Sequence, residues 1–421
     1  MGYATTNPFT GDVEKTFETA TTEQIEAAIT LADQAFQTWR DKPVAERVQV
    51  LQKAADLLRA DVRGFASILT KEMGKLIGEA EAEVNLCIGM LEYYVANAEE
   101  QLAPRTLPAK GFDQGDVVIH HEPLGVLYAV EPWNFPFYQV IRIGAPQFSA
   151  GNSIVLKHAS NVPQSALAME KLFRDAGAPE GLLVNVFASH EAAEQMLSDP
   201  RVRGVALTGS EGAGASVAAT AAKHLTKSTL ELGGADAFIV LDDAEVDKAV
   251  KWAVFGRHWN AGQVCCSSKR VIVVDGVYDD FLAKYRQGVA ELVAGDPMAE
   301  ETTLAPLSSQ AAADDLAKLV EQARGRAARW RRWAIRYPSR EPSSSPRSSP
   351  TSRRAPRPPS RSSSVLSRRS TGPRMPTTRC GSPMPRPSAW AVRSSPPTRR
   401  RAGRWPVAWT PAWSTSTSRP G

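Results

Sequence analysis

Hydrophobic residues recur every three or four positions through the first hundred residues of the chain. Ile25, Ala28, Ile29 and Ala32 follow this spacing, which places them on one face of a helix. The same spacing, with many Ala, Glu, Leu and Lys residues, continues from about residue 21 to residue 97. It predicts a series of amphipathic helices that pack through their apolar faces.

The pattern changes after about residue 100. Proline and glycine interrupt the helical spacing, and short apolar runs typical of strands then alternate with helical stretches. The expected strands are 117–119, 126–130, 153–157, 183–187, 204–207 and 238–241, and the expected helices are 165–176, 191–197, 214–225 and 246–259. This alternation predicts an α/β fold whose parallel sheet is covered on both faces, with ligand-binding loops at the carboxyl ends of the strands.

The composition changes abruptly near residue 325. Residues 326–421 contain 22 Arg, 20 Ser and 17 Pro but no Lys, and Glu341 is their single acidic residue. Such a segment has too few apolar residues to bury a core, so we expect a disordered Arg/Ser/Pro-rich tail. The net charge of +5 hides this division, because residues 1–325 alone carry −16. The acidic part and the basic tail therefore need separate interpretations.

Two interpretations of the tail stay open. An Arg-rich segment can bind nucleic acid through its phosphates, although electrostatics alone would accept Lys as readily as Arg. The absence of Lys instead favours a GC-rich gene translated in the wrong frame. A shift of one base allows residues 361–367 to encode Glu-Leu-Phe-Gly-Pro-Val and residues 409–417 to encode Met-Asp-Ala-Gly-Met-Val-Asn-Val-Asn. Both hidden strings are typical of a folded enzyme, so we interpret the tail as out of frame.

Cysteine usage and hydropathy bear on the cellular compartment. The chain has four cysteines, Cys87, Cys265, Cys266 and Cys380, and no secretory signal precedes them. This number and context do not indicate a disulfide framework and fit a reducing compartment. No apolar run approaches the roughly 18 residues that span a bilayer. We therefore expect a cytoplasmic protein that does not insert into a membrane.

Three segments carry side chains suited to catalysis. Cys265 follows a glycine-containing loop and precedes a second thiol, Cys266. Glu231 lies between two leucines and before two glycines, where a partly desolvated carboxylate can act as a base. Asn134 lies in a Pro-Trp-Asn-Phe-Pro segment, and its amide could donate to a developing oxyanion. Each also has a structural explanation, namely a buried free thiol, a salt-bridged carboxylate and an asparagine in a turn.

A fourth segment, residues 207–214, follows a predicted strand and opens a predicted helix. Free amides at the start of a helix bind phosphate groups. The segment lacks the GxGxxG pattern, so it is weak evidence for a dinucleotide when taken alone. The four segments point to a common chemistry only in combination.

These segments and several others form a set of motifs that extends over residues 7–307. The set is Asn7-Pro-Phe-Thr-Gly11, Glu72-Met-Gly-Lys75, Pro132-Trp-Asn-Phe-Pro136, Leu156-Lys157, Thr208-Gly-Ser210, Glu231-Leu-Gly-Gly234, Gly262-Gln-Val-Cys265 and Gly295-Asp-Pro297. Together they resemble the aldehyde dehydrogenase superfamily. Residues 157–163 and 262–270 look most like those of bacterial NADP-dependent succinate-semialdehyde dehydrogenases.

The resemblance implies roles for three residues. The Cys265 thiolate attacks the aldehyde carbon to form a thiohemiacetal. The Asn134 side chain and the backbone amide of Cys265 hold the oxyanion. After hydride transfer to the nicotinamide, Glu231 activates the water that cleaves the thioester. The expected reaction is the NAD(P)-dependent oxidation of an aldehyde, with succinate semialdehyde and its product succinate as the favoured pair.

The resemblance also implies a nicotinamide cofactor and no metal. The residues expected to bind the cofactor are Trp133, Asn134, Lys157, Ser160, Gly209, Ser210, Gly214 and Leu232. Many NAD-using relatives place a glutamate where this chain has Ser160, and that carboxylate would repel a 2′-phosphate. A serine beside cationic Lys157 therefore favours NADP, with NAD still allowed.

Two further side chains have open interpretations. Arg142, eight residues after Asn134, could pair with a distal carboxylate of the substrate, as its counterpart is thought to do in semialdehyde enzymes. A structural arginine explains it equally well. Oxidation could join Cys266 to the nucleophile as a disulfide, although a bridge between adjacent cysteines is strained.

The fold implied is aldehyde-dehydrogenase-like, with a Rossmann-type cofactor domain and an incomplete α/β catalytic domain. The expected parts are 1–111, the helical part of the cofactor domain; 112–126, a bridging strand segment for oligomerisation; 127–233, the NADP-binding domain; 234–325, the first part of the catalytic domain; and 326–421, the tail.

In the printed frame the family's Glu-x-Phe-Gly-Pro motif, which holds the nicotinamide ribose, is missing. The chain as written is therefore expected to lack part of its catalytic domain. We expect that such a polypeptide could be inactive or insoluble. An intact chain is expected to form a homo-oligomer and to take a small aldehyde as its partner. The alternative, a non-catalytic protein with a nucleic-acid-binding tail, is disfavoured.

Overall fold

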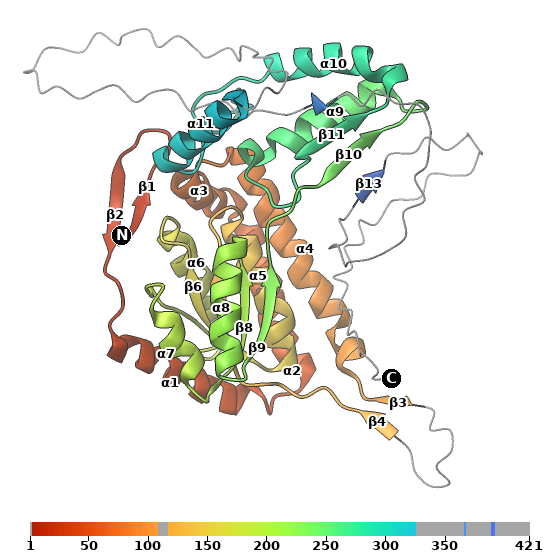
Figure 1. The fold of residues 1–421 in the computed structure, drawn as a ribbon. Coiled ribbons are helices and arrows are strands. Elements are labelled where there is room, and N and C mark those ends of the chain that lie inside the picture. Colours follow the sequence, from red (N-terminus) through yellow and green to blue (C-terminus); the bar gives the residue numbers. More distant parts are fainter. Residues whose placement is uncertain (1, 108–116, 326–365, 368–388, 392–421) are drawn as a thin grey trace, which may run out of the picture.

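A computed structural model describes residues 2–107, 117–325, 366–367 and 389–391 (Figure 1). The elements of the first part are β1 (Tyr3–Thr6), β2 (Val13–Phe17), α1 (Thr22–Trp39), α2 (Val44–Ala60), α3 (Val62–Met73), α4 (Ile77–Leu102), β3 (Arg105–Leu107), β4 (Val117–Ile119), β5 (Val126–Glu131), α5 (Pro136–Ala150), β6 (Ser153–His158), α6 (Pro163–Asp175), β7 (Leu183–Asn185), α7 (Ala192–Ser198), β8 (Val202–Thr208), α8 (Glu211–Lys223) and β9 (Lys227–Glu231). The remaining elements are β10 (Ala237–Val240), α9 (Val246–His258), the 3₁₀ turn η1 (Trp259–Gly262), β11 (Arg270–Val273), α10 (Asp275–Ala290), α11 (Gln310–Gly325), β12 (Leu366–Ser367) and β13 (Ala389–Ala391).

The larger sheet has five parallel strands in the order β7-β6-β5-β8-β9. Strand order reverses between β5 and β8, because the chain first adds β6 and β7 on one side and later adds β8 and β9 on the other. Ligands bind outside the carboxyl ends of the strands at such a reversal. The predicted parallel α/β sheet is confirmed.

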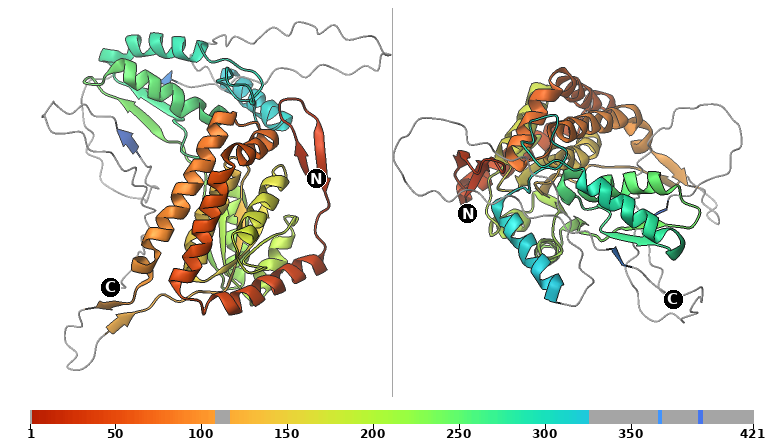
Figure 2. Two further views of the ribbon diagram at one scale, coloured as in Figure 1. Left: turned by 180° about the vertical axis from the view of Figure 1, so that it is seen from behind. Right: turned by 90° about the horizontal axis from the view of Figure 1, so that it is seen from above.

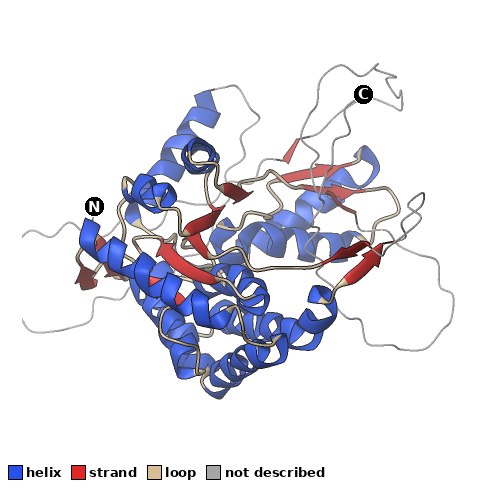
Figure 3. Ribbon diagram, turned by 90° about the horizontal axis from the view of Figure 1, so that it is seen from below, coloured by secondary structure: helices blue, strands red, loops and turns tan. Residues whose placement is uncertain are grey.

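Helices cover both faces of this sheet, as Figures 2 and 3 show. Along β5, Leu127 and Ala129 pack into a core shared with α2, α4, α5 and α6. Val126 and Tyr128 point to the opposite face and pack with α1, α7 and α8. Side chains of successive strand residues alternate between faces, so an apolar run buried on both sides is what this architecture requires.

Local sequence explains where several helices begin. Thr21 caps α1 in a capping box, since its hydroxyl accepts from the Gln24 backbone while the Gln24 side chain accepts from the Thr21 backbone. Ser210 caps α8 by accepting from the Ala213 backbone amide. The second cap places the Thr-Gly-Ser segment between the end of β8 and the first turn of α8.

A second, smaller sheet has the order β12-β11-β10-β13, and its pairings are parallel. β10 and β11 pack with α9 and α10 around a separate core that includes Val240, Ala253 and Phe281. β12 and β13 come from the predicted tail, most of which lies outside the described residues. The predicted boundaries at 111, 126, 233 and 325 remain predictions.

Several elements were not assigned by the hydrophobic pattern. They are the strands β1, β2, β3, β9 and β11 and the helices α5, α10 and α11, whereas β4 has the predicted bounds 117–119. The other predicted strands and helices are present, with ends that differ by a few residues. Among the described helices, none is both long enough and apolar enough to cross a bilayer.

Candidate active site

Polar side chains line the carboxyl edge of the larger sheet. The strand pairing sets Glu131 opposite His158 and Thr208 opposite Glu231, so β6, β5, β8 and β9 each end on a polar residue. The Pro-Trp-Asn-Phe-Pro segment follows β5 directly and carries Asn134 over this edge. The edge is therefore where the fold gathers the predicted catalytic residues from distant parts of the sequence.

The cysteine loop begins with an unusual backbone turn. Asn260, Ala261 and Gly262 all have positive φ, of 50°, 54° and 78°. Non-glycine residues adopt this left-handed conformation only at a cost. At Gly262 a Cβ atom would lie 2.8 Å from the backbone oxygen of Arg257, so glycine is favoured there on both conformational and steric grounds. The turn redirects the chain from α9 toward the sheet edge.

The Cys265 thiol is exposed and lies in a setting that favours its anionic form. A hydrogen bond from the neighbouring Cys266 thiol is the main cause that lowers the pKa of Cys265, to about 6, and the positive charges of Arg142 and Lys269 also lower it. The same coupling raises the pKa of Cys266. Cys265 is therefore the member of the pair that ionises at neutral pH, as a nucleophile must. Both thiols are free in the structure.

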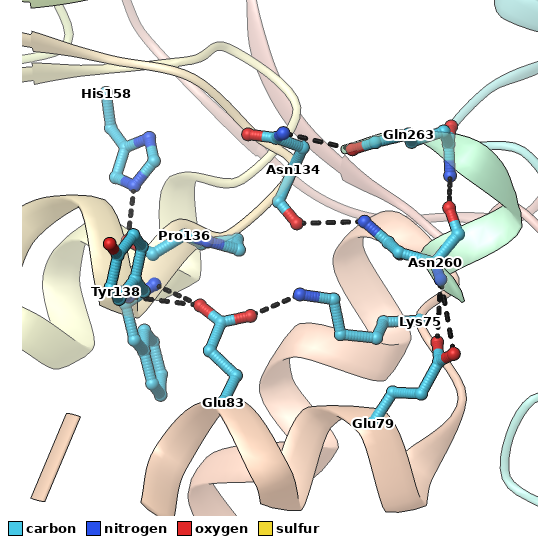
Figure 4. A network of polar contacts seen from close by, with 10 residues as sticks. Lys75, Glu79, Glu83, Asn134, Pro136, Tyr138, His158, Asn260 and Gln263 are labelled. Atoms are coloured by element: carbon cyan, nitrogen blue, oxygen red, sulfur yellow. Dashed lines mark hydrogen bonds and ion pairs between the residues drawn. The ribbon is translucent and has the colours of Figure 1, made fainter. Parts of the chain in front are cut away.

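Asn134 and the cysteine loop are joined by reciprocal hydrogen bonds (Figure 4). The Asn134 side-chain amide donates to the carbonyl of Gln263 at 3.0 Å, and the Asn260 side-chain amide donates to the carbonyl of Asn134 at 3.0 Å. Gln263 in turn donates to the carbonyl of Asn260. An amide NH₂ has two N–H donors, so Asn134 keeps one for an oxyanion near Cys265.

A buried layer of charged residues on α4 lies beneath this pair (Figure 4). Glu79 accepts from the backbone amide of Asn260 at 3.2 Å through both carboxylate oxygens. Burial raises the pKa of Glu79 to about 7, against the lowering effects of that hydrogen bond and of Lys75. Glu79 thus fixes the first residue of the left-handed turn from the helix below it.

Glu83, one turn further along α4, holds the other side of the site. One oxygen accepts from the backbone amides of Phe137 and Tyr138 at 2.9 and 3.0 Å, and the other pairs with Lys75. The ammonium of Lys75 also lies 3.6 Å from the centre of the Phe135 ring. The start of α5, and with it the Asn134 loop, is therefore anchored to α4.

His158 anchors the same loop from β6. It is buried, and burial lowers its pKa to about 4, so it is neutral at pH 7. Because Nδ1 accepts from the Ala159 amide, Nε2 carries the hydrogen and donates to the carbonyl of Pro136 at 2.9 Å.

The spacing of Glu79 and Glu83 was the signal available in the sequence for the layer on α4. Residues four apart lie on one face of a helix, and Lys75 lies in the loop just before α4. The hydrophobic pattern led us to assign that region only to helix packing, so the layer was missed.

Glu231 ends β9 and is paired with Arg142 of α5. Its carboxylate lies 3.5 Å from Nη1 of Arg142, whose Nη2 donates to the Thr208 hydroxyl at 2.7 Å. The Glu231 side chain is 59% exposed, so water can reach it. Arg142 thus connects the predicted base to the sheet edge and adds positive potential at Cys265.

Glu131 is a buried carboxyl at the end of β5 that the sequence analysis did not single out. It is 3% exposed, and its Oε2 has no hydrogen-bond partner in the described part of the chain. Burial raises its pKa to about 8, which the charge of Arg142 partly offsets. A carboxyl group in this state is protonated at neutral pH. Its position as the final residue of a buried apolar strand was the available signal.

The residues predicted to bind a dinucleotide lie along the same edge. Lys157 is buried near the end of β6, its ammonium lies 5.9 Å from the centre of the Tyr3 ring, and burial lowers its pKa. It forms no ion pair within the described chain, so a bound anion would compensate its charge. Ser160 is exposed three residues later, and its hydroxyl does not repel a phosphate. This donor set fits a phosphorylated ribose.

The first turn of α8 offers a second anion-binding feature. The amide of Gly209 donates to the carbonyl of Glu231, which joins the Thr-Gly-Ser segment to the end of β9. A Cβ atom at Gly214 would lie 2.6 Å from a methyl group of Leu232, so glycine allows α8 to approach β9 closely. Ser210 and the exposed Gly212 open the helix. Backbone amides and the helix dipole at this end favour a phosphate.

The structure therefore brings Asn134 against the cysteine loop and places Arg142 between Cys265 and Glu231. Trp133 is half-buried in the same loop as Asn134. No group of three His, Cys, Asp or Glu side chains suited to a metal ion occurs among the described residues.

Comparison with known proteins gives a consistent result. The model of the aldehyde dehydrogenase family matches residues 1–331. The NADP(+) succinate-semialdehyde dehydrogenase of Deinococcus radiodurans is 47% identical over 321 residues, which are 76% of this chain and 67% of that protein. A probable enzyme of the same kind from Synechocystis is 43% identical over 76% of this chain and 70% of its own length.

A solved structure supports the same relationship. The crystal structure of succinic semialdehyde dehydrogenase from Streptococcus pyogenes in complex with NADP+ is 45% identical, with a TM-score of 0.75. The match covers 77% of this chain and 71% of that one. In each comparison the shared part leaves out about a quarter of this chain, and the family match ends six residues beyond the change in composition at 325.

Proposed function

The chain belongs to the aldehyde dehydrogenase family, and from this premise we propose that it catalyses the NADP-dependent oxidation of succinate semialdehyde to succinate. The observation that carries the proposal is the convergence of Asn134, Cys265 and Glu231, which are linked by the Asn134–Gln263 hydrogen bond and by Arg142. The relatives named above act on this substrate with this cofactor.

The first step is the attack of a thiolate on an aldehyde. Cys265 forms a carbon–sulfur bond with the aldehyde carbon, and the carbonyl oxygen becomes an oxyanion. The free N–H of the Asn134 amide and the backbone N–H of Cys265 donate to that oxyanion. The buried layer on α4 keeps the Asn134 loop in place, so these donors are oriented before the substrate arrives.

The second step is hydrolysis of the thioester. When bound, NADP+ supplies the acceptor for the hydride that leaves the thiohemiacetal carbon. Glu231 then takes a proton from a water molecule that attacks the resulting thioester on Cys265, which releases succinate and regenerates the thiol. The exposed carboxylate of Glu231 can meet such a water.

Lys157, Ser160 and the first turn of α8 would hold the phosphates of NADP. Lys157 places a buried ammonium in β6 that forms no ion pair with any described residue, and residue 160 is a serine and not a carboxylate. This arrangement favours a 2′-phosphate over a free 2′-hydroxyl. Gly209, Ser210 and Gly214 would accommodate the pyrophosphate, with Trp133 and Leu232 beside the nicotinamide end.

Arg142 would select a substrate with a carboxylate at its far end. The Arg142 side chain is 30% exposed, and its Nη1 lies 3.5 Å from the Glu231 carboxylate. A substrate carboxylate could therefore replace Glu231 and form a bidentate pair with the guanidinium. Pairing with the substrate would also release Glu231 for its role as a base. Succinate semialdehyde carries the required carboxylate at a short distance from its aldehyde.

The same proposal covers location and assembly. The free thiols fit a reducing compartment such as the cytoplasm. A homo-oligomer would use the segment around β3 and β4, which projects from the body of the molecule in Figure 1. The nucleic-acid alternative depends on the tail, which lies almost wholly outside the described residues.

NADPH formation from succinate semialdehyde and NADP+ tests the proposal. The printed chain and a chain with the tail restored to the alternative frame are compared, each with Cys265→Ala and with Glu14→Gln, at an exposed position of β2, as the control. We expect Cys265→Ala to abolish activity and Glu14→Gln to leave it unchanged. NADPH from Cys265→Ala at the parent rate, or none from either parent chain, would overturn the proposal.

A further inference from the structure

Lys269 closes the turn that carries the nucleophile. This nucleophile turn, residues 264–269, connects the left-handed loop to β11. The ammonium of Lys269 is half-buried and donates to the backbone carbonyl of Cys265 at 2.5 Å and to that of Val264 at 3.1 Å. A charged donor thus binds the nucleophile residue itself, a few covalent bonds from the sulfur.

The remaining hydrogen bonds of the nucleophile turn hold its far side. The Ser267 amide donates to the Val264 carbonyl at 3.1 Å, and the Ser267 hydroxyl and the Ser268 amide both donate to the carbonyl of Gly256 in α9. These contacts fix the turn against α9 without involving Cys265. Lys269 is therefore the side chain within the turn that links its geometry to the position of Cys265.

Lys269 also interacts electrostatically with the Cys265 thiol. The ionisable groups that interact with Cys265 or with Lys269 are Tyr138 and Arg142 from α5, Asp236 before β10, Arg257 from α9, and Cys266. Asp236 favours the charged lysine, and Arg257 opposes it. Lys269 forms no ion pair within the described residues, so its charge is not neutralised by a direct carboxylate contact.

We propose that Lys269 is a positioning residue that clamps the two carbonyls of the nucleophile turn and adds positive charge beside Cys265. Two properties of the side chain are used at once. The hydrogen bonds hold the ammonium close to the sulfur, and its charge stabilises the thiolate. The effect is reciprocal, because the thiolate stabilises the ammonium against the cost of its partial burial.

The inference rests on the proposed function only in taking Cys265 as the nucleophile. Its test needs neither aldehyde nor NADP. Alkylation by iodoacetamide consumes the thiolate, since the sulfur displaces iodide, so the rate follows the ionised fraction of the thiol as pH changes. Peptide mapping by mass spectrometry assigns the label to Cys265 or Cys266 in the full 421-residue chain.

Three substitutions separate charge from hydrogen bonding. Lys269→Arg keeps the charge and the donors, Lys269→Gln keeps a donor without charge, and Lys269→Met removes both. Lys251→Met, at an exposed position of α9 with no hydrogen bond to the turn, is the matched control. Thermal unfolding of each variant shows whether it is folded before its thiol is titrated.

We expect the alkylation profile of Cys265 to move about one pH unit upward in both Lys269→Met and Lys269→Gln, which is about a fivefold lower rate at pH 6 because the parent thiol is about half ionised there. Lys269→Arg and Lys251→Met should match the parent. If Lys269→Met fails to fold, the comparison of Gln with Arg carries the same information. A Gln variant with the parent profile, or an Arg variant shifted as far as Gln, would overturn the proposal.

Failure of this inference differs from failure of the proposed function. Unshifted profiles together with NADPH formation would remove the role of Lys269 and leave the enzyme assignment intact. Shifted profiles without any NADPH formation would support the role of Lys269 and contradict the enzyme assignment. A parent chain in which Cys265 titrates like an ordinary thiol would also overturn the role given to Lys269.

Discussion

At the scale of single residues, the site contains a carboxyl group that the fold keeps protonated. Glu131 is buried at the end of β5, with one oxygen lacking any hydrogen-bond donor in the described structure. Its pKa is raised from an ordinary 4.5 to about 8 because its charged form loses hydration. The group is therefore neutral in the folded chain over a pH range in which it is ionised in the unfolded chain.

This difference predicts how stability depends on pH. Between about pH 5 and pH 8 the folded chain retains a proton that the unfolded chain releases, so the free energy of unfolding falls as pH rises. Glu131→Gln has no proton to retain. At about 1.4 kcal/mol per pKa unit, the variant should gain a few kcal/mol relative to the parent between pH 5 and pH 8.5.

Urea unfolding at both pH values measures this gain. Glu14→Gln, at an exposed position of β2, is the control and should follow the parent. Parallel pH curves for the parent and for Glu131→Gln would show that Glu131 ionises normally in the folded state.

The residues proposed to carry the chemistry could be singled out in the sequence because each belongs to a short local motif. Cys265, Asn134 and Glu231 are recognisable from neighbours in the sequence, and all three lie at or beside the carboxyl edge. Their partners were not predictable, because Glu79 and Lys269 act through backbone groups that only the folded chain brings near. Whether Arg142 binds substrate stays a prediction, since in this structure it pairs with Glu231.

At the scale of elements, Glu83 of α4 links a buried ion pair to the start of α5. Lys75 and Glu83 have fully buried side chains, and Glu83 also accepts two backbone hydrogen bonds at the start of α5. The residue before α5, Phe135, offers no side-chain cap. Glu83 therefore replaces a local N-cap from another helix, which links stability to the position of the Asn134 loop.

Breaking this pair should be costly, whereas replacing both partners should cost less. Glu83→Leu leaves the Lys75 ammonium buried without a counter-ion and should lose about 3–5 kcal/mol of unfolding free energy. Adding Lys75→Met removes the unpaired charge and should recover part of that loss. Urea unfolding of the two single variants and the double variant measures the coupling. A double variant less stable than Glu83→Leu alone would contradict this account.

Missing local signals explain why the hydrophobic pattern did not predict α5 and β9. α5 lacks a local cap residue, so no start signal precedes it in the sequence. β9 is largely exposed, with the burial pattern of a strand at the edge of a sheet. Continuous apolar runs such as β5 and β6 were predicted correctly, because burial on both faces leaves a clear mark on the sequence.

At the scale of the whole molecule, two observations place the end of the family-like sequence at nearly the same residue. The composition changes at residue 325, and the family match ends at residue 331. The shared part covers 67% of the Deinococcus radiodurans relative, so about a third of that protein has no counterpart in the match. Sequence composition alone could find this boundary, but the structure that residues 326–421 adopt could not be predicted from a pattern without hydrophobic periodicity.

The reading-frame interpretation predicts a specific DNA result. One inserted or missing base should lie near codons 320–330, and correcting it should replace the Arg-rich tail with a sequence that contains the Glu-Leu-Phe-Gly-Pro-Val string. The corrected chain should form NADPH faster than the printed chain, because its catalytic domain is complete. Raw sequencing reads without such a base change would contradict the interpretation and favour a genuine basic tail.

The most direct measurement is the mass of the Cys265 peptide in the Glu231→Gln chain after incubation with succinate semialdehyde and NADP+. The substitution removes the base that would hydrolyse the thioester, and one turnover per molecule is enough for detection, so a slow chain still gives an answer. We expect a succinyl group on Cys265 that forms only when NADP+ is present. An unmodified Cys265, or the same adduct without NADP+, would contradict it.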